Sequence, residues 1–123
     1  MKPYLHAMKS AKKYGGQWQD YIELHNWFDQ TKQNVPDVRH RLILHNAFGI
    51  FLLEKQFGIT LKNSAGRTFS VRDVGEDHVL EDLGTIPTLE KCLSLVNIEA
   101  AHWLGGRRIK TSNKKKIHIP LAD

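Results

Sequence analysis

The stretch VRHRLILHNAFGIFLLEKQF, residues 38–57, decides the fold that this chain is expected to adopt. Its apolar residues recur at positions that cover nearly the full circumference of a helix, at roughly 100° per residue. A helix with this pattern is surrounded by protein and does not lie on the surface. The stretch follows Pro36-Asp37 and is closed by Gly58, a usual residue at a helix C-terminus. The sequence therefore predicts a central helix over about residues 37–57.

Two histidines, His40 and His45, fall within this predicted central helix. They are five residues apart, so an ideal helix rotates them by roughly 140° relative to each other. We therefore do not expect both of them to bind one metal ion. His45 is the favoured site residue, because Gly49 lies one turn further on and leaves room for a close approach.

The segments on either side predict a mainly α (α+β) fold in which helices surround the central one. Helices are predicted where apolar residues recur every three or four positions, and a hairpin is predicted where two short alternating segments flank a turn. The expected elements are a basic helix over 3–13, an amphipathic helix over about 18–32, a β-hairpin over about 59–72, a helix over 73–83 and a last helix over about 86–96.

Length and charge predict a single domain with a basic end. A chain of 123 residues is long enough for one compact core, and no stretch approaches the roughly 20 apolar residues of a membrane span. The start of the chain lacks the apolar run of a secretory signal. Residues 1–104 contain 12 Lys+Arg and 12 Asp+Glu, whereas residues 105–123 contain six and one. We expect a helical domain over 1–104, a basic tail over 105–123, a cytoplasmic location and no membrane contact.

The basic tail is a candidate nucleic-acid contact. Each Lys or Arg that neutralises a phosphate releases condensed counterions, so such a tail can bind DNA without reading its sequence. The alternative interpretation is a disordered tail whose charge keeps the protein soluble. Binding to phosphates would weaken steeply as salt rises. The candidate contact residues are Arg107, Arg108, Lys110, Lys114, Lys115 and Lys116.

Histidines outside the central helix extend the candidate site. His25 lies within the apolar stripe of the predicted second helix, so its side chain should face the core, with Asp29 one turn on along the same side. His78 and Asp82 are four residues apart on the predicted helix over 73–83 and therefore share a face. The remaining histidines are expected at the surface: His6, His102 and His118.

The start of the predicted helix over 73–83 has two interpretations. Asp73 and Glu76 have the spacing of a capping box, in which the side chains at the two positions satisfy backbone N–H groups of the first turn. Glu76 is therefore either a helix cap or a further member of the histidine site.

Four segments occur together in this chain: HNWFD (25–29), DVRHR (37–41), GIF (49–51) and VGEDHVLEDLGTIPT (74–88). In this order they resemble a family of short proteins of unknown function found in bacteriophage and bacterial genomes. The resemblance covers roughly residues 2–96 and leaves the basic tail outside. It implies a small, mainly helical fold and a phage origin, hence a location in the host cytoplasm, and it implies no activity. It also implies signature positions for His25, Asp29, His40, His45, Glu76, His78 and Asp82.

The predicted ligand set for a metal ion is His25, His45, His78 and Asp82. Imidazole and carboxylate groups bind zinc, manganese and iron, and a catalytic site needs three protein ligands with one position left for water. A divalent metal ion, zinc or manganese, is therefore the expected cofactor. The ligand types are similar to those of helical metal-dependent phosphohydrolases with His, His-Asp and Asp ligands, although this chain has no His-Asp dipeptide.

The leading functional hypothesis is a small metal-assisted phosphodiesterase or nicking nuclease acting on DNA. His45 and His78 would stand at the catalytic centre, where the metal lowers the pKa of its bound water. Arg39, Arg41 or Arg72 would hold the phosphate, with Arg41 and Arg72 favoured, because a guanidinium offers paired donors to its oxygens. A buried histidine network can also specify a core without catalysis. The alternative is therefore a non-enzymatic phage adaptor or inhibitor that binds a host DNA-processing or defence protein, and a plain nucleic-acid binder is a third interpretation.

Overall fold

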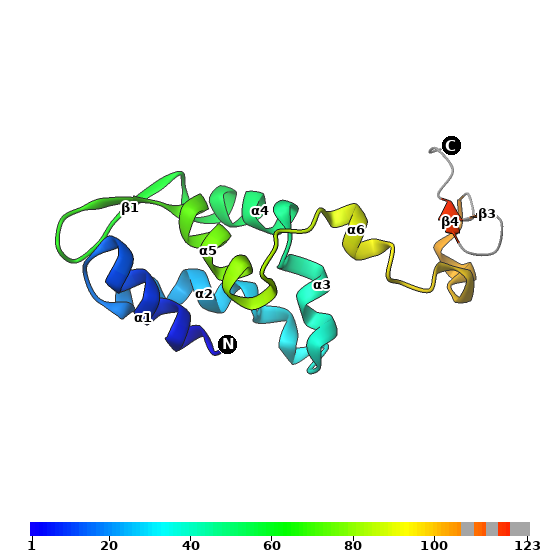
Figure 1. Cartoon of the computed structure of the whole chain (residues 1–123), viewed down its shortest axis with the longest axis horizontal. Coiled ribbons are helices and arrows are strands. Elements are labelled where there is room, and N and C mark those ends of the chain that lie inside the picture. Colours follow the sequence, from blue (N-terminus) through cyan, green and yellow to red (C-terminus); the bar gives the residue numbers. More distant parts are fainter. Residues whose placement is uncertain (107–109, 113–115, 119–123) are drawn as a thin grey trace. The chain divides into compact units, whose positions relative to one another are not determined.

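A computed structural model gives the fold, and it describes residues 1–106, 110–112 and 116–118. The chain forms two compact units, Met1–Leu89 and Glu90–Asp123. The first unit holds most of the helices and a β-hairpin, which confirms the expected mainly helical fold (Figure 1). Among the described residues, every helix is too short or too polar to cross a lipid bilayer. The domain boundary expected after residue 104 stays a prediction.

Helices α1 (Pro3–Tyr14) and α2 (Ile22–Phe28) pack against each other, joined by a 3₁₀ turn (Trp18–Asp20). Helix α1 matches its prediction closely, whereas the second helix expected over about 18–32 is wrong in its extent. Its α-helical part ends at Phe28, because the N–H of Asp29 bonds back to the carbonyl of Asn26 and tightens the last turn. A separate 3₁₀ helix (Gln30–Gln33) follows.

The central helix expected over about 37–57 is interrupted. It consists of a 3₁₀ turn (Val38–His40), helix α3 (Arg41–Leu44) and helix α4 (Ala47–Phe57). Asn46 causes the break, because its extended backbone begins α4 and its Oδ1 accepts a hydrogen bond from the Gly49 N–H at 2.8 Å. Its Nδ2 donates to the carbonyls of Leu42 and Ile43, each at 3.2 Å, and so closes the end of α3.

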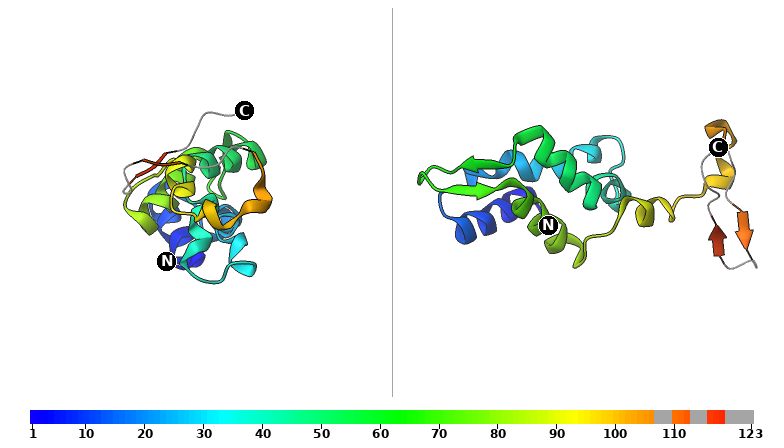
Figure 2. Two further views of the ribbon diagram at one scale, coloured as in Figure 1. Left: turned by 90° about the vertical axis from the view of Figure 1, so that its right-hand side faces the viewer. Right: turned by 90° about the horizontal axis from the view of Figure 1, so that it is seen from above.

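Helix α4 leads into the predicted hairpin and helix α5. Strand β1 (Thr60–Lys62) pairs antiparallel with β2 (Thr68–Ser70), and the pair lies at one end of the helical unit (Figure 2). Helix α5 (Val71–Leu83) begins two residues earlier than expected, because Ser70 is its cap and accepts a hydrogen bond from the Asp73 N–H. The predicted Asp73 and Glu76 capping box is therefore wrong, and Glu76 instead accepts a hydrogen bond from Arg72.

Helices α4 and α5 lie side by side, and both pack against α2 (Figure 1). Gly75 permits this closeness, since a Cβ there would lie 3.0 Å from Leu53 Cδ2 and 3.3 Å from Phe28 Cζ. The aliphatic and aromatic side chains at this junction are buried. The core therefore forms where α2, α4 and α5 meet, and His25, His45 and His78 are buried within it. The main apolar members are Tyr21, Leu24, Phe28, Leu53, Val71, Val74 and Val79.

The second unit contains short elements only, within the residues described. Helix α6 (Leu89–Leu93) is shorter than the helix predicted over about 86–96, since bonds from Leu95 and Val96 back to residues three positions earlier tighten its end. Strands β3 (Lys110–Ser112) and β4 (Lys116–His118) pair antiparallel. His102 is exposed, as expected. Of the predicted DNA contacts, Arg107, Arg108, Lys114 and Lys115 lie outside the described residues, and the structure gives Lys110 and Lys116, like His118, as backbone only.

Candidate metal centre

Four ligand atoms meet in the core of the first unit, one each from Asp29, His45, His78 and Asp82, and all lie within 4.8 Å of one another. The Nε2 atom of His45 is 3.2 Å from Nε2 of His78 and 3.0 Å from Oδ2 of Asp82. The Nε2 atom of His78 is 3.3 Å from the same Asp82 oxygen. Asp29 Oδ1 stands slightly apart, 3.5 Å from His45 Nε2 and 4.0 Å from His78 Nε2.

These separations fit the coordination shell of one small cation. Bonds of roughly 2.0–2.1 Å to a tetrahedral zinc ion place neighbouring ligand atoms about 3.3 Å apart. The three distances among His45, His78 and Asp82 are 3.0, 3.2 and 3.3 Å. Two facing ring nitrogens share at most one proton, whereas a cation between them would satisfy both lone pairs. The cluster can therefore hold a metal ion.

Local structure aims each of these side chains at the same point. His45 occupies the break between α3 and α4, where its φ of −80° and ψ of 63° leave the helical path. His78 and Asp82 lie four residues apart on α5 and so share one face of it. Asp29 is the residue directly after α2. The site thus depends on the interruption of the central helix and on the early end of the second one.

Burial and hydrogen bonding shift the pKa values of two members of the cluster, His78 and Asp82. His45 and His78 are fully buried, and the side chain of Asp82 is 1% exposed. Burial lowers the pKa of His78 to about 4, so its ring is neutral at pH 7. Burial by itself would raise the pKa of Asp82, but hydrogen bonds from His45, His6 and His78 outweigh it and hold that pKa far below its usual range. Neutral imidazoles and an ionised carboxylate are the forms that act as ligands.

The predicted ligand His25 lies behind His78 and apart from His45. Its Nδ1 is 2.8 Å from Nδ1 of His78, and its Nε2 is 2.8 Å from Ser10 Oγ. Burial lowers the pKa of His25 to about 2, so the ring is neutral and one of its nitrogens can accept a hydrogen bond. If His78 binds a metal through Nε2, its Nδ1–H donates to His25, whose Nε2–H donates to Ser10. Partners of this kind orient a ligand ring, so His25 is better suited to positioning His78 than to binding the ion directly.

The expectation that His6 lies at the surface is wrong, because its side chain is fully buried on the inner face of α1. Its Nδ1 is 2.6 Å from Glu81 Oε1 and its Nε2 is 3.2 Å from Asp82 Oδ1. Burial opposes the charged ring, but the hydrogen bonds to Asp82 and Glu81 prevail and raise the pKa of His6. The sequence signal was the spacing of His6, Ala7 and Ser10, which puts these small and polar residues on one face of the helix.

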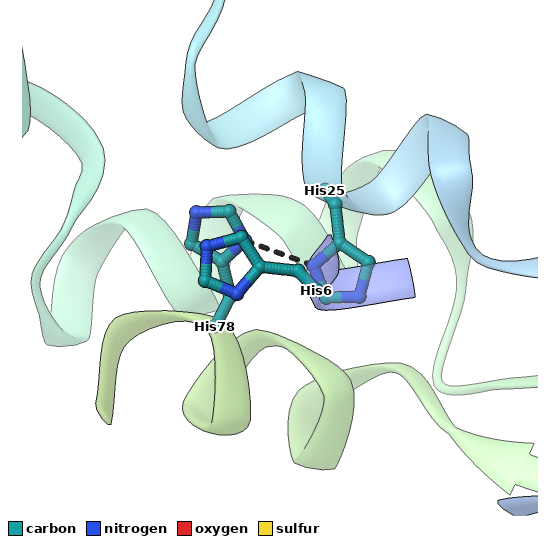
Figure 3. A group of neighbouring side chains, drawn as sticks. All are labelled: His6, His25 and His78. Carbon is teal, nitrogen blue, oxygen red and sulfur yellow. Dashed lines mark hydrogen bonds between the residues drawn. The ribbon is translucent and has the colours of Figure 1, made fainter. Parts of the chain in front are cut away.

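His6, His25 and His78 form a second group of close nitrogens, but their ring geometry does not suit a metal. The rings of His6 and His78 stack with centroids 3.9 Å apart and an interplanar angle of 28° (Figure 3). The lone pair of an imidazole nitrogen lies in the ring plane, so stacked rings direct their lone pairs along parallel directions that do not converge. The cluster around Asp82 is therefore the better candidate site.

The structure separates the two favoured phosphate-binding arginines. Arg41 lies at the edge of the cluster, with Nη2 3.7 Å from Asp82 Oδ1 and its side chain 28% exposed. Arg72 is exposed and bonded to Glu76, and these two residues line a different hollow of about 300 Å³ together with Glu54. Arg41 alone of the two is thus placed beside the candidate metal position.

His40 and His45 approach each other more closely than a continuous helix allows. Their ring centroids are 5.7 Å apart, and His40 Nε2 is 3.4 Å from Asp29 Oδ1. The expected angular separation does not apply, because the backbone leaves the helix at His45. Gly49, thought to make room for His45, instead makes room for the backbone, since a Cβ there would collide with the Leu44 carbonyl oxygen.

Two polar atoms of the cluster are buried without a hydrogen-bond partner, Asp29 Oδ2 and His45 Nδ1. Asp29 belongs to the cluster through Oδ1. The sequence analysis placed it one turn from His25 and did not include it among the predicted ligands. A buried carboxylate oxygen without a partner is costly unless a ligand or water satisfies it. Asp29 Oδ2 therefore marks the side of the cluster on which a further group can bind.

Comparison with known proteins yields one family assignment. A family model described as "Domain of unknown function (DUF6915)" matches residues 1–104. No curated protein and no solved structure matches the chain.

Proposed function

The chain belongs to this family of domains of unknown function, and we propose from the cluster itself that it is a divalent-metal-dependent phosphodiesterase or nicking nuclease acting on DNA. The observation that supports the proposal is the set of near-equal distances, 3.0, 3.2 and 3.3 Å, among the ligand atoms of His45, His78 and Asp82. Two imidazoles and one carboxylate form a ligand set that catalytic zinc and iron sites use, with further positions open. Zinc or manganese is the proposed ion.

Asp29 suits a catalytic role beside the metal better than a fourth permanent ligand. Its Oδ1 stands farther from the two histidine nitrogens than Asp82 does, and its Oδ2 has no partner. A divalent ion held by His45, His78 and Asp82 would lower the pKa of a water molecule beside this carboxylate. The carboxylate would then take the proton from that water as its oxygen attacks phosphorus, while the bond to the leaving alkoxide breaks and solvent protonates the alkoxide.

Arg41 would bind the phosphate in this scheme. It is the more exposed neighbour of Asp82, and its guanidinium can offer two parallel N–H groups to phosphate oxygens. Asp29 is also more exposed than the three proposed ligands, so the substrate would approach from the side of Asp29 and Arg41. The basic residues beyond position 106 would add sequence-independent affinity for DNA in the cytoplasm of a host cell.

Hydrolysis of bis(p-nitrophenyl) phosphate and nicking of supercoiled plasmid test this function. The full chain should act on both with Mn²⁺ or Zn²⁺. His45→Ala should lose metal and activity together, whereas Asp29→Asn should keep the metal and lose rate by about 10²–10⁴-fold, the usual effect of removing a general base. Arg41→Ala should chiefly raise KM. Metal-loaded wild type without hydrolysis, or Asp29→Asn with full rate, would reject the catalytic role.

One observation favours a second candidate function. The side chains of His45, His78 and Asp82 are at most 1% exposed, which is typical of structural metal sites. In that case the ion stabilises the core of a non-enzymatic adaptor or inhibitor that binds a host DNA-processing or defence protein. Phe48 and Phe51 on α4 are 44% and 51% exposed and would supply part of the contact. This candidate predicts metal-dependent stability without hydrolysis, and a partner whose capture is lost in Phe51→Ser.

A further inference from the structure

The outward face of α1 combines apolar and basic side chains that the metal site does not use. Tyr4, Met8, Lys9 and Lys12 are exposed on it, with Tyr4 and Met8 at 47% and 46%. At roughly 100° per residue, Tyr4 and Met8 project within about 40° of each other, and Lys12 and Lys9 follow at about 80° and 140° from Tyr4. Leu5, which is 49% exposed, projects at about 100° from Tyr4, between the two lysines, so apolar and basic side chains are interleaved on this face.

This face of the helix leads to a tryptophan and an open hollow. Trp18 meets Tyr4 edge to face, with ring centroids 5.0 Å apart and an interplanar angle of 76°. A hollow of about 400 Å³ lies beside it, lined by Met8, Lys12, Trp18 and Gln19 among others. The hollow thus offers an aromatic surface, an amide side chain and an ammonium group within one concave region.

Charge indicates what kind of molecule fits this face. Residues 1–19 contain four lysines and no acidic residue, and the next residue, Asp20, has its Oδ2 occupied by hydrogen bonds from the N–H groups of Gln17 and Ser64. Lys13 is paired with Asp77, whereas Lys9 and Lys12 are exposed on the outward face. A complementary occupant carries regularly spaced negative charges and flat apolar groups. Single-stranded nucleic acid has both, since its bases stack on aromatic side chains while its phosphates contact lysines.

We propose that this face of α1, with Trp18, is a binding surface for single-stranded nucleic acid. One base stacks against the exposed part of Trp18 in the hollow, and the flanking phosphates contact Lys9 and Lys12. The amide of Gln19 offers a donor and an acceptor to a base edge, groups that the hydrocarbon of a membrane would leave unsatisfied. The proposed surface includes none of the basic residues beyond position 106 and requires no metal.

Fluorescence anisotropy of a labelled oligothymidylate tests the proposal, with the full chain in EDTA so that the result does not depend on the metal site. The double variant Lys9→Gln/Lys12→Gln should bind more weakly by roughly tenfold per lysine at 50 mM salt and should lower the salt slope by about 1.4, the counterion release of two contacts to a single strand. The matched control is Lys32→Gln/Lys62→Gln, two exposed lysines elsewhere on the first unit, and it should bind as wild type does.

Tryptophan fluorescence tests the stacking of a base on Trp18. In a chain that retains only Trp18, made by Trp27→Phe and Trp103→Phe and checked for folding by circular dichroism, the oligonucleotide should quench the remaining emission. Three results would overturn the proposal: unchanged affinity of Lys9→Gln/Lys12→Gln, an equal loss in the control pair, or unquenched Trp18. Binding to phosphatidylglycerol vesicles with no binding to the oligonucleotide would overturn it in favour of a lipid surface.

Discussion

Replacing Asp82 by Asn tests the most connected side chain of the cluster. One carboxylate oxygen lies 3.0 Å from His45 Nε2 and 3.3 Å from His78 Nε2, and the other lies 3.2 Å from His6 Nε2. The substitution keeps the size of the side chain, removes its charge and turns one of these acceptors into a donor. The buried histidine nitrogens then lack the anion that they face.

The expected loss has two parts. Breaking a buried ion pair by removing one partner costs roughly 3–5 kcal/mol, and this part is present without metal. If Asp82 also binds a metal, the variant forgoes the stabilisation that binding supplies, about 2.7 kcal/mol when free metal is 100 times the Kd. The difference in free energy of unfolding between wild type and variant should therefore rise from about 4 kcal/mol in EDTA to about 7 kcal/mol with metal.

Urea unfolding followed by circular dichroism, with EDTA or with excess Zn²⁺, measures both parts. The control is Asp37→Asn, an exposed carboxylate paired with Arg39, which should leave the transition unchanged in both buffers. A loss for Asp82→Asn that is the same with and without metal would refute the ligand role. A negligible loss in EDTA would refute the view that this carboxylate organises the buried histidines.

Three further outcomes are expected. Gly75→Ala should lower the free energy of unfolding by about 1 kcal/mol. The new Cβ would lie 3.0 Å from Leu53 Cδ2, and this overpacking outweighs the gain in helix propensity. A variant that is more stable than wild type in urea titration would contradict this packing. Asn46→Ala should cost about 2 kcal/mol and reduce helicity, because it removes the cap of α4 together with the bonds that close α3; unchanged unfolding would show that the break does not depend on this side chain. In EDTA the chain should lose stability between pH 6.5 and pH 4, on the order of 3 kcal/mol from His78, because its folded pKa of about 4 lies below the unfolded value and the unfolded chain takes up the proton first. The raised pKa of His6 has the opposite sign but acts above this window, because its contribution is complete below pH 6.5 and is lost as pH rises through the folded value. Stability in urea that does not change between pH 6.5 and pH 4 would therefore contradict the expected loss.

Local patterns in the sequence were sufficient to predict several of the elements. Helix α1, the β1–β2 hairpin and the shared face of His78 and Asp82 all depend on residues within a few positions of one another. The burial of His25 and His45 was also predictable, because each lies among apolar residues at helical spacing. Patterns of this kind report what a segment does by itself.

The break at Asn46 was missed because apolar residues continue at helical spacing on both sides of it. A single asparagine that bonds to the Gly49 N–H and to the end of α3 outweighed that periodicity. The consequence for the site is large, since the break alone frees His45 from the helical path and directs it toward α5. The spacing of an asparagine three residues before a glycine is a weak signal unless the fold is known.

His6 was missed for a different reason. The lysines of α1 suggested a surface helix, and its inner face is made of His6, Ala7 and Ser10 and not of large apolar residues. The partners of His6 are Glu81 and Asp82, more than 70 residues away in sequence. No pattern within one segment predicts a contact across that separation, so the composition of the site depended on tertiary packing.

Metal analysis of the purified full chain tests the central claim most directly. After loading and dialysis, plasma mass spectrometry should find one zinc or manganese ion per wild-type chain, none in His45→Ala or Asp82→Asn, and one in His102→Ala, an exposed histidine outside the cluster. X-ray absorption of the zinc form should then give two imidazole nitrogens and oxygen ligands at roughly 2.0–2.2 Å. A folded wild-type chain that holds no ion, or a bound ion that survives both substitutions, would contradict a metal site at His45, His78 and Asp82.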